Sequence, residues 1–275
     1  MMWFILGLSL ILLPVNRRLA GFPAILAIVL AGVQGVMDWR GLAVIAAILL
    51  TAVGWHKAKG SPAVRAGLEL LLFAAALGLM VHQLPGFHNL RVLDGVRAGA
   101  LSAPFTMYYN LDKALVPFVA FTIVSTLFTD GEKHAVPAWR WLLLALCVPG
   151  LLVLATLAGG LRFEPHLPAW LPQFLFANVL FVSFAEEALF RGWLQQRLTQ
   201  WISAVPALIA TSALFGLAHL SGGPLLVVFA TLAGLIYGLA WMWSRRLWVA
   251  VLFHAGFNLC HLLLFTYPML RPLHG

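Results

Sequence analysis

Long apolar runs separated by short polar segments make up most of the chain. They cover residues 2–15, 19–37, 41–55, 66–82, 111–128, 141–160, 170–198, 204–220, 224–243 and 247–267. A helix needs about 20 residues, each adding ~1.5 Å, to cross the hydrocarbon core of a bilayer. The first and third runs are short for this purpose. The pattern therefore predicts an all-α, polytopic transmembrane bundle of eight to ten helices.

The polar segments indicate how the chain is organised. We expect residues 1–139 to form an N-terminal transmembrane region without an assigned role, and residues 140–275 to form the functional core. The longest polar interruption, residues 82–113, predicts either a connecting loop or a re-entrant element. Gly234 and Gly238 lie four residues apart in an apolar run, which favours a close contact between helices.

Composition supports a membrane protein. Of the 275 residues, 62% are hydrophobic and only 9% are charged, which is too little charge to cover the surface of a soluble domain of this size. The formal net charge of +8 would suggest nucleic-acid binding in a soluble protein. Here the bases lie in short segments between apolar runs, where they orient helices against anionic lipid. We therefore expect the lipid bilayer as a partner, and no nucleic acid.

The distribution of basic residues predicts the orientation. The N-terminal run has no basic residue before it and no small-residue cleavage site after it, so we expect a first span with its N-terminus outside. The loops that then lie inside contain more bases than the outer loops, among them Lys57, Lys59, Arg65, Arg197, Arg245 and Arg246. This bias favours a multi-pass membrane protein whose inner loops face the cytoplasm. We expect the bacterial inner membrane, with the functional cavity reached from the cytoplasmic side.

Two adjacent glutamates lie in one apolar run. Of the acidic residues we expect within spans, Glu69 lies near an end, whereas Glu186 and Glu187 lie deep, where ionised groups are costly and indicate function. Glu187 and Arg191 have the i, i+4 spacing of a helical ion pair. Glu186 points about 100° away without a local partner, so it is free to act as a general base. The alternative is that all three residues form a packing network.

Three more polar side chains follow in later runs, namely His219, His254 and Asn258. His254 and Asn258 are i and i+4, so they project from one face of a helix, which must then face the bundle interior. Unpaired polar groups are unfavourable against lipid. The pattern therefore predicts that Glu186, His219, His254 and Asn258 converge on one polar catalytic cavity in the C-terminal half.

Three motifs occur in order on successive apolar runs: "EEALFR" at 186–191, "FGLAH" at 215–219 and "HAGFN" at 254–258. In this order and spacing, they resemble the CAAX-protease and bacteriocin-processing family of intramembrane endopeptidases, also called the Abi family, which includes the type II prenyl-protein endopeptidases. The resemblance extends over about residues 140–267.

The resemblance implies hydrolysis of a peptide bond in a membrane-associated peptide or lipidated protein. It implies that Glu186 and His219 activate water and that His254 and Asn258 stabilise the oxyanion, while Glu187, Arg191 and Phe215 support the site. These residue types suit the reaction, which needs an activated water, oxyanion donors and an acid for the leaving amine. The motifs contain no serine or cysteine, which argues against an acyl-enzyme.

Other interpretations remain open. Glu186, His219 and His254 could also form a zinc site with one open position, although HExxH is absent and Asn258 would be a poor ligand. We expect no cofactor. The same three side chains could instead form the relay of a proton-coupled transporter. A non-catalytic immunity or scaffold protein on the same fold is the third possibility.

Overall fold

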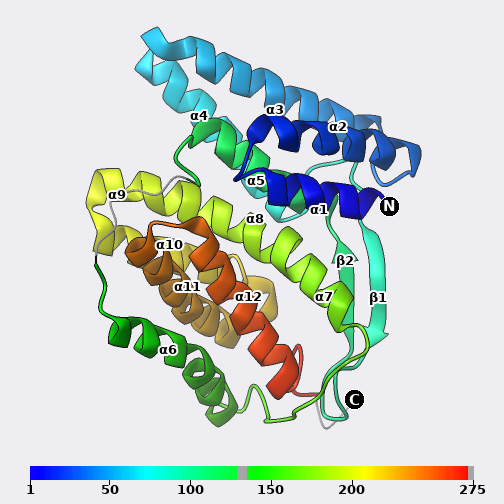
Figure 1. The fold of residues 1–275 in the computed structure, drawn as a ribbon, viewed down its shortest axis with the longest axis vertical. Coiled ribbons are helices and arrows are strands. Elements are labelled where there is room, and N and C mark those ends of the chain that lie inside the picture. Colours follow the sequence, from blue (N-terminus) through cyan, green and yellow to red (C-terminus); the bar gives the residue numbers. More distant parts are fainter. Residues whose placement is uncertain (129–134, 272–275) are drawn as a thin grey trace.

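The computed structural model describes residues 1–128 and 135–271, and it is mainly helical (Figure 1). Each predicted apolar run forms a helix. The elements are α1 (Met2–Leu12), α2 (Arg17–Val33), α3 (Trp39–Lys57), η1 (Ala58–Gly60), α4 (Pro62–Met80), β1 (Leu90–Val96), β2 (Phe105–Tyr109), α5 (Leu111–Ile123), α6 (Ala138–Leu157), α7 (Leu171–Ala177), η2 (Asn178–Ser183), α8 (Phe184–Glu187), η3 (Ala188–Gln195), α9 (Gln196–Ile202), α10 (Ala204–Leu217), η4 (Leu220–Gly222), α11 (Pro224–Ser244) and α12 (Leu247–Leu264).

Local signals set several helix starts. The Asn16 side chain accepts hydrogen bonds from the backbone N–H groups of Arg18 and Leu19 at the start of α2. Asp38 accepts one from Arg40 N, at 2.8 Å, at the start of α3. Such caps satisfy amide groups that lack a partner in the first helical turn. The polar residues between the apolar runs thus determine where these helices begin.

Within the described residues, six helices are long and apolar enough to cross a membrane, so the prediction of eight to ten spans is not confirmed. They are Trp39–Gly60, Pro62–Met80, Ala138–Leu157, Leu171–Ile202, Pro224–Ser244 and Leu247–Leu264. The apolar helices α1 and α10 are shorter than a full span. The protein is nevertheless an integral, multi-pass membrane protein by this measure.

One continuous helix, Leu171–Ile202, runs through the middle of the bundle and consists of α7, η2, α8, η3 and α9. Its 32 residues would extend about 48 Å at ~1.5 Å each, more than the ~30 Å of a hydrocarbon core, so the helix must tilt or protrude. The segments η2 and η3 are π-helical. Wider turns of this kind often occur at functional sites, and here they flank Glu186 and Glu187.

The polar interruption at residues 82–113 contains a β-hairpin. Strands β1 and β2 are antiparallel, with Leu90 opposite Tyr109 and Val96 opposite Phe105. Asp112, an acidic residue that the sequence analysis overlooked, begins α5 and is buried. Its carboxylate lies 2.8 Å from His82 Nδ1 and accepts a hydrogen bond from Asn89 Nδ2 at 3.0 Å. These contacts attach the hairpin to the helices.

The helices form two groups around the central helix. Figure 1 shows α1–α5 on one side of it and α6 with α10–α12 on the other. The main hydrophobic core contains buried side chains from both groups, from Met2 to Leu262.

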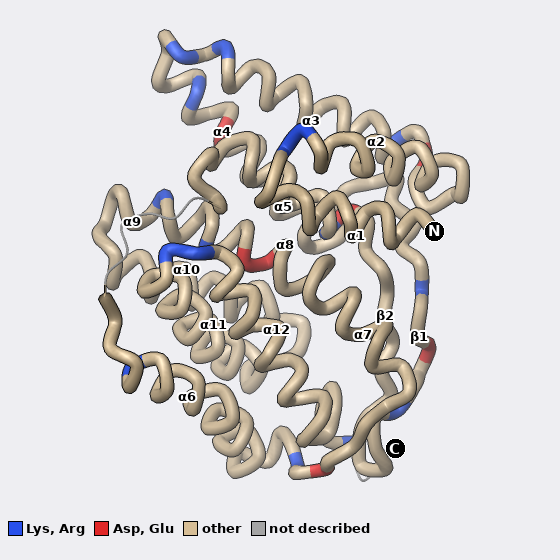
Figure 2. The backbone as a smooth tube through the Cα atoms, viewed as in Figure 1, with Lys and Arg blue, Asp and Glu red and all other residues tan. Residues whose placement is uncertain are grey.

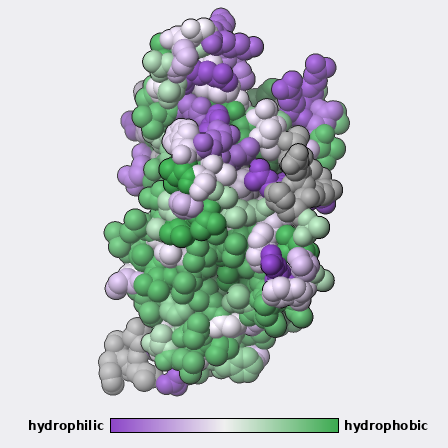
Figure 3. All heavy atoms as spheres, turned by 90° about the vertical axis from the view of Figure 1, so that its left-hand side faces the viewer, coloured by the Kyte–Doolittle hydropathy of each residue, from purple (hydrophilic) through white to green (hydrophobic). Residues whose placement is uncertain are grey.

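Many large apolar side chains face outward on α2, α3, α4, α6 and α10. Figure 3 shows a broad apolar surface with hydrophilic residues gathered above it. Such a surface suits lipid. The division at residue 139 stays a prediction.

Helices α10 and α11 pack closely through glycines. A methyl group added at Gly216 would meet the Thr231 side chain and the Val227 carbonyl, and one at Gly234 would lie 3.2 Å from Arg191 Nη2. The contact predicted at Gly234 and Gly238 is therefore confirmed. It brings the α11 backbone against the side chains of the central helix.

Candidate active site

Glu187 and Arg191 form the predicted ion pair at the centre of the bundle. Arg191 Nη1 donates to Glu187 Oε1 at 2.8 Å, and both side chains are fully buried. Arg191 Nη2 donates to the Gly234 carbonyl of α11 at 2.9 Å. The guanidinium also lies over the rings of Phe215, at 4.5 Å, and Tyr237, at 5.3 Å. Arg191 therefore connects the central helix to α10 and α11.

His254 of α12 binds the same carboxylate. Its Nδ1 lies 2.8 Å from Glu187 Oε1, and its ring stacks on Tyr237 with centroids 4.5 Å apart and planes 12° apart. An ionised carboxylate can only accept, so Nδ1 must carry the proton in this contact. This orientation places the other nitrogen, Nε2, 3.9 Å from Glu186 Oε2.

Glu186 has a partner that the sequence analysis did not foresee. Lys113 Nζ donates to Glu186 Oε1 at 2.6 Å, and the two side chains are only 13% and 9% exposed. The spacing predicted only that Glu186 has no partner on its own helix, which says nothing of distant segments. Lys113 lies on α5, which packs against α8. The other oxygen, Oε2, is buried without a hydrogen-bond partner in the described part of the chain.

The charges in this cluster balance. Glu186 and Glu187 contribute two negative charges, and Lys113 and Arg191 contribute two positive ones. Burying ionised groups is costly unless each has a partner. The cluster is therefore neutral when His254 is neutral, and a second proton, on Nε2 of His254, gives it a net positive charge. Figure 2 shows these acidic residues of α8 in the middle of the fold, whereas most bases lie near helix ends.

His219 lies two residues after the end of α10 and is partly exposed. Its Nδ1 lies 2.8 Å from the Phe215 carbonyl, and because a carbonyl can only accept, Nδ1 carries the proton and Nε2 keeps its lone pair in the neutral ring. The ring of Phe215 contacts the rings of both His219, at 4.8 Å, and His254, at 5.8 Å. Phe215 thus lies between the two imidazoles.

Asn258 lies one helical turn beyond His254 and is partly buried. Its side chain makes no hydrogen bond to any other residue that the structure describes. Convergence of all four predicted residues on one hydrated cavity stays a prediction. Two cavities, of about 380 and 340 Å³, lie elsewhere, around Arg197.

The described side chains form no evident metal site, and the zinc alternative stays a prediction to be tested. Within residues 1–128 and 135–271, no three His, Cys, Asp or Glu side chains are grouped so that they could hold one. Glu186 Oε1 is already bound by the Lys113 ammonium group, and His254 Nδ1 faces Glu187. We therefore derive no step through a metal.

Sequence reasoning missed two residues of the cluster. Lys113 lies inside a predicted apolar run, so a charge within a span could have identified it. Tyr237 lies in the segment already noted for its two glycines, but nothing in its position indicated stacking on His254.

Part of the chain matches a known protein family. Residues 168–260 match the family described as type II CAAX prenyl endopeptidase Rce1-like, which confirms the resemblance to the CAAX-protease family. The matched segment is shorter than the predicted 140–267, but it contains all three motifs. No curated protein and no solved structure matches the chain.

Proposed function

We propose, from the match of residues 168–260 to the type II CAAX prenyl endopeptidases, that this protein cleaves a peptide bond in a membrane-associated or lipidated protein. In this proposal, Glu186 and His219 activate the attacking water. The observation that carries it is the placement of Glu186, with one oxygen bound to Lys113 and the other 3.9 Å from His254 Nε2.

Glu186 is suited to act as the general base. Lys113 occupies Oε1, so Oε2 is the oxygen that remains able to accept a proton. The 3.9 Å separation from His254 Nε2 is too long for a direct hydrogen bond, but it suits two groups that bind one water between them. Glu186 would take a proton from this water as the water attacks the carbonyl carbon.

His219 is suited to transfer the second proton. Because Nδ1 donates to the Phe215 carbonyl, the lone pair on Nε2 can accept a proton from water and later give it to the leaving amine. The bond to Phe215 also holds the ring in one tautomer, as in other enzymes in which a second group orients a catalytic histidine.

His254 and Asn258 supply oxyanion donors in this mechanism. Glu187 holds the His254 ring through the contact with Nδ1, and Nε2, when it carries a proton, is a donor toward the developing negative charge. The amide group of Asn258, one turn away, adds a second donor. In this arrangement Glu187 and Arg191 do not touch the substrate but fix His254.

Lys113 acts in this mechanism as a positioning residue. It holds one oxygen of Glu186 in place, which leaves the other directed toward His254. Lys113→Met should lower kcat with little change in KM, since the substrate is not its partner. Lys113→Arg, which keeps the positive charge, should recover part of the activity. Equal losses in both variants with intact folding would contradict this role.

The test uses purified full-length protein in detergent with fluorogenic membrane peptides, prenylated and unprenylated. Glu186→Gln keeps the shape of the side chain but cannot accept a proton, so kcat/KM should fall by roughly 10² to 10⁴. The matched control is Glu164→Gln, at the far end of the bundle, where Glu164 binds Leu101 N and Ser102 Oγ. Activity that survives in Glu186→Gln would refute the mechanism.

A chelator titration tests the zinc alternative. We expect the rate to be unchanged, because Lys113 already neutralises the carboxylate that would bind a metal. Reversible loss of activity that added Zn²⁺ restores would instead support a zinc enzyme.

A further inference from the structure

A polar cavity of about 380 Å³ opens where the α3–α4 connection meets the end of α5 and the start of α9. Its lining includes Arg65, Arg197, His56 and the hydroxyl residues Thr122, Ser125 and Thr126. The volume lies within the range of small-molecule sites. None of the residues of the proposed active site lines it, so this cavity is a separate feature.

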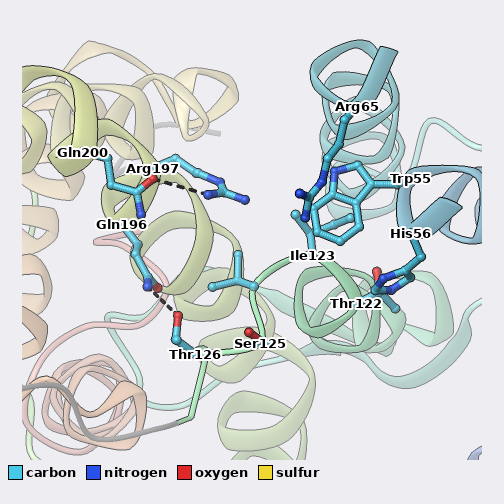
Figure 4. A pocket seen from close by; sticks show the side chains of 11 residues that line it. Trp55, His56, Arg65, Thr122, Ile123, Ser125, Thr126, Gln196, Arg197 and Gln200 are labelled. Atoms are coloured by element: carbon cyan, nitrogen blue, oxygen red, sulfur yellow. Dashed lines mark hydrogen bonds between the residues drawn. The ribbon is translucent and has the colours of Figure 1, made fainter. Parts of the chain in front are cut away.

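Two guanidinium groups enter the cavity from opposite walls (Figure 4). Arg197 is neutralised by Glu69, with contacts of 2.6 and 3.2 Å. Arg65 has no acidic partner in the described part of the chain. Its guanidinium lies 3.9 Å over the Trp55 ring, and its Nε is buried without a hydrogen bond. A partly buried cation with an unmatched donor is unfavourable, so this cavity favours an anion.

The donors match a phosphate group. Arginine forms paired hydrogen bonds with phosphate oxygens, and hydroxyl groups can complete the shell. Among the described lining residues there is no carboxylate to repel an anion.

An apolar groove lies beside the cavity and favours a lipid as the source of the phosphate. This second space, about 340 Å³, shares Arg197 and Gln200 with the first, and its walls include Leu70, Phe73 and Trp201, with Glu69 bound to Arg197. A polar chamber joined to an apolar groove suits a headgroup and an acyl chain. We propose that the cavity binds the phosphate group of an anionic phospholipid, with an acyl chain along the groove.

The test measures binding, so it does not depend on proteolysis. Full-length protein in detergent is titrated with phosphatidylglycerol, and bound lipid is counted by native mass spectrometry. Arg65→Gln should weaken binding about 10- to 100-fold, as expected for the loss of hydrogen bonds to a charged group. The matched control is Lys59→Gln, which removes the same charge from an exposed neighbouring position outside the cavity and should change affinity less than about twofold.

Further variants and competing ligands distinguish a specific lipid site from general surface attraction and from a site for free phosphate. Arg65→Lys keeps the positive charge but loses the paired N–H donors of the guanidinium, so this variant should bind phosphatidylglycerol about tenfold more weakly than the unchanged protein. It replaces Arg65→Gln in the test if Arg65→Gln does not elute as a folded species. Phosphatidylcholine should compete weakly. Equal losses in Arg65→Gln and Lys59→Gln would show general surface attraction and overturn the site. If inorganic phosphate displaces phosphatidylglycerol at a concentration similar to that of the lipid, the cavity binds phosphate, but the proposal that a lipid supplies it is wrong.

Discussion

Replacing Arg191 by methionine should destabilise the protein strongly, because Arg191 holds a fully buried charge pair. The change removes the 2.8 Å bond to Glu187, the 2.9 Å bond to the Gly234 carbonyl and the contact with the Phe215 ring. Methionine fills much of the same volume, so little of the loss should come from a cavity. Removing one partner of a buried ion pair costs about 3–5 kcal/mol, and we expect a loss in this range.

The same helix provides a matched control. Arg197 also pairs with a glutamate, Glu69, at 2.6 Å, but these side chains are 29% and 21% exposed. Because partly solvated pairs contribute about 0–1 kcal/mol, Arg197→Met should cost far less than Arg191→Met. The two variants make the same substitution and differ mainly in burial.

A double variant separates charge from packing. With Glu187→Gln added to Arg191→Met, no uncompensated carboxylate remains, and the new amide oxygen can still accept a hydrogen bond from His254 Nδ1. We expect the double variant to recover more than about 1 kcal/mol relative to Arg191→Met, since residues in one buried network do not contribute additively.

The measurement is reversible unfolding in mixed micelles, followed by tryptophan fluorescence and checked by gel filtration. The reasoning fails if Arg191→Met and Arg197→Met lose stability equally. It also fails if adding Glu187→Gln lowers stability further, because packing rather than charge would then dominate.

Three further outcomes are expected. His219→Ala should lower kcat/KM by roughly 10² to 10⁴ at unchanged folded yield, measured with the same peptide assay, because the ring is partly exposed and makes one hydrogen bond; a large drop in yield would point to a structural role. Gly216→Ala should cost about 1–3 kcal/mol because the added methyl group overlaps the Thr231 side chain, whereas Gly32→Ala, which meets no neighbour, should leave the melting temperature unchanged or higher. A cysteine at the exposed position of Trp201 should react with a membrane-impermeant maleimide only after cells are opened, and labelling of intact cells would reverse the proposed orientation.

The sequence by itself determined the features that depend only on residues close together in the chain. Every apolar run forms a helix because backbone groups without access to water must bond within their own segment. The Glu187–Arg191 pair follows from i, i+4 spacing on one helix. The three motifs predicted the family that residues 168–260 match, because their residue types, order and spacing are all present in the chain itself.

Only the tertiary structure decided which distant groups meet. Lys113 precedes Glu186 by 73 positions, and no periodicity along the chain predicts that α5 packs against α8. The same holds for His254, whose contact with Glu187 depends on how α12 crosses the central helix. Hydropathy alone also left the number of full spans undecided, because it identifies apolar residues but does not distinguish full spans from short packed helices such as α1. Local periodicity thus specifies each helix, whereas the partners of a buried charge depend on the packing of helices far apart in the chain.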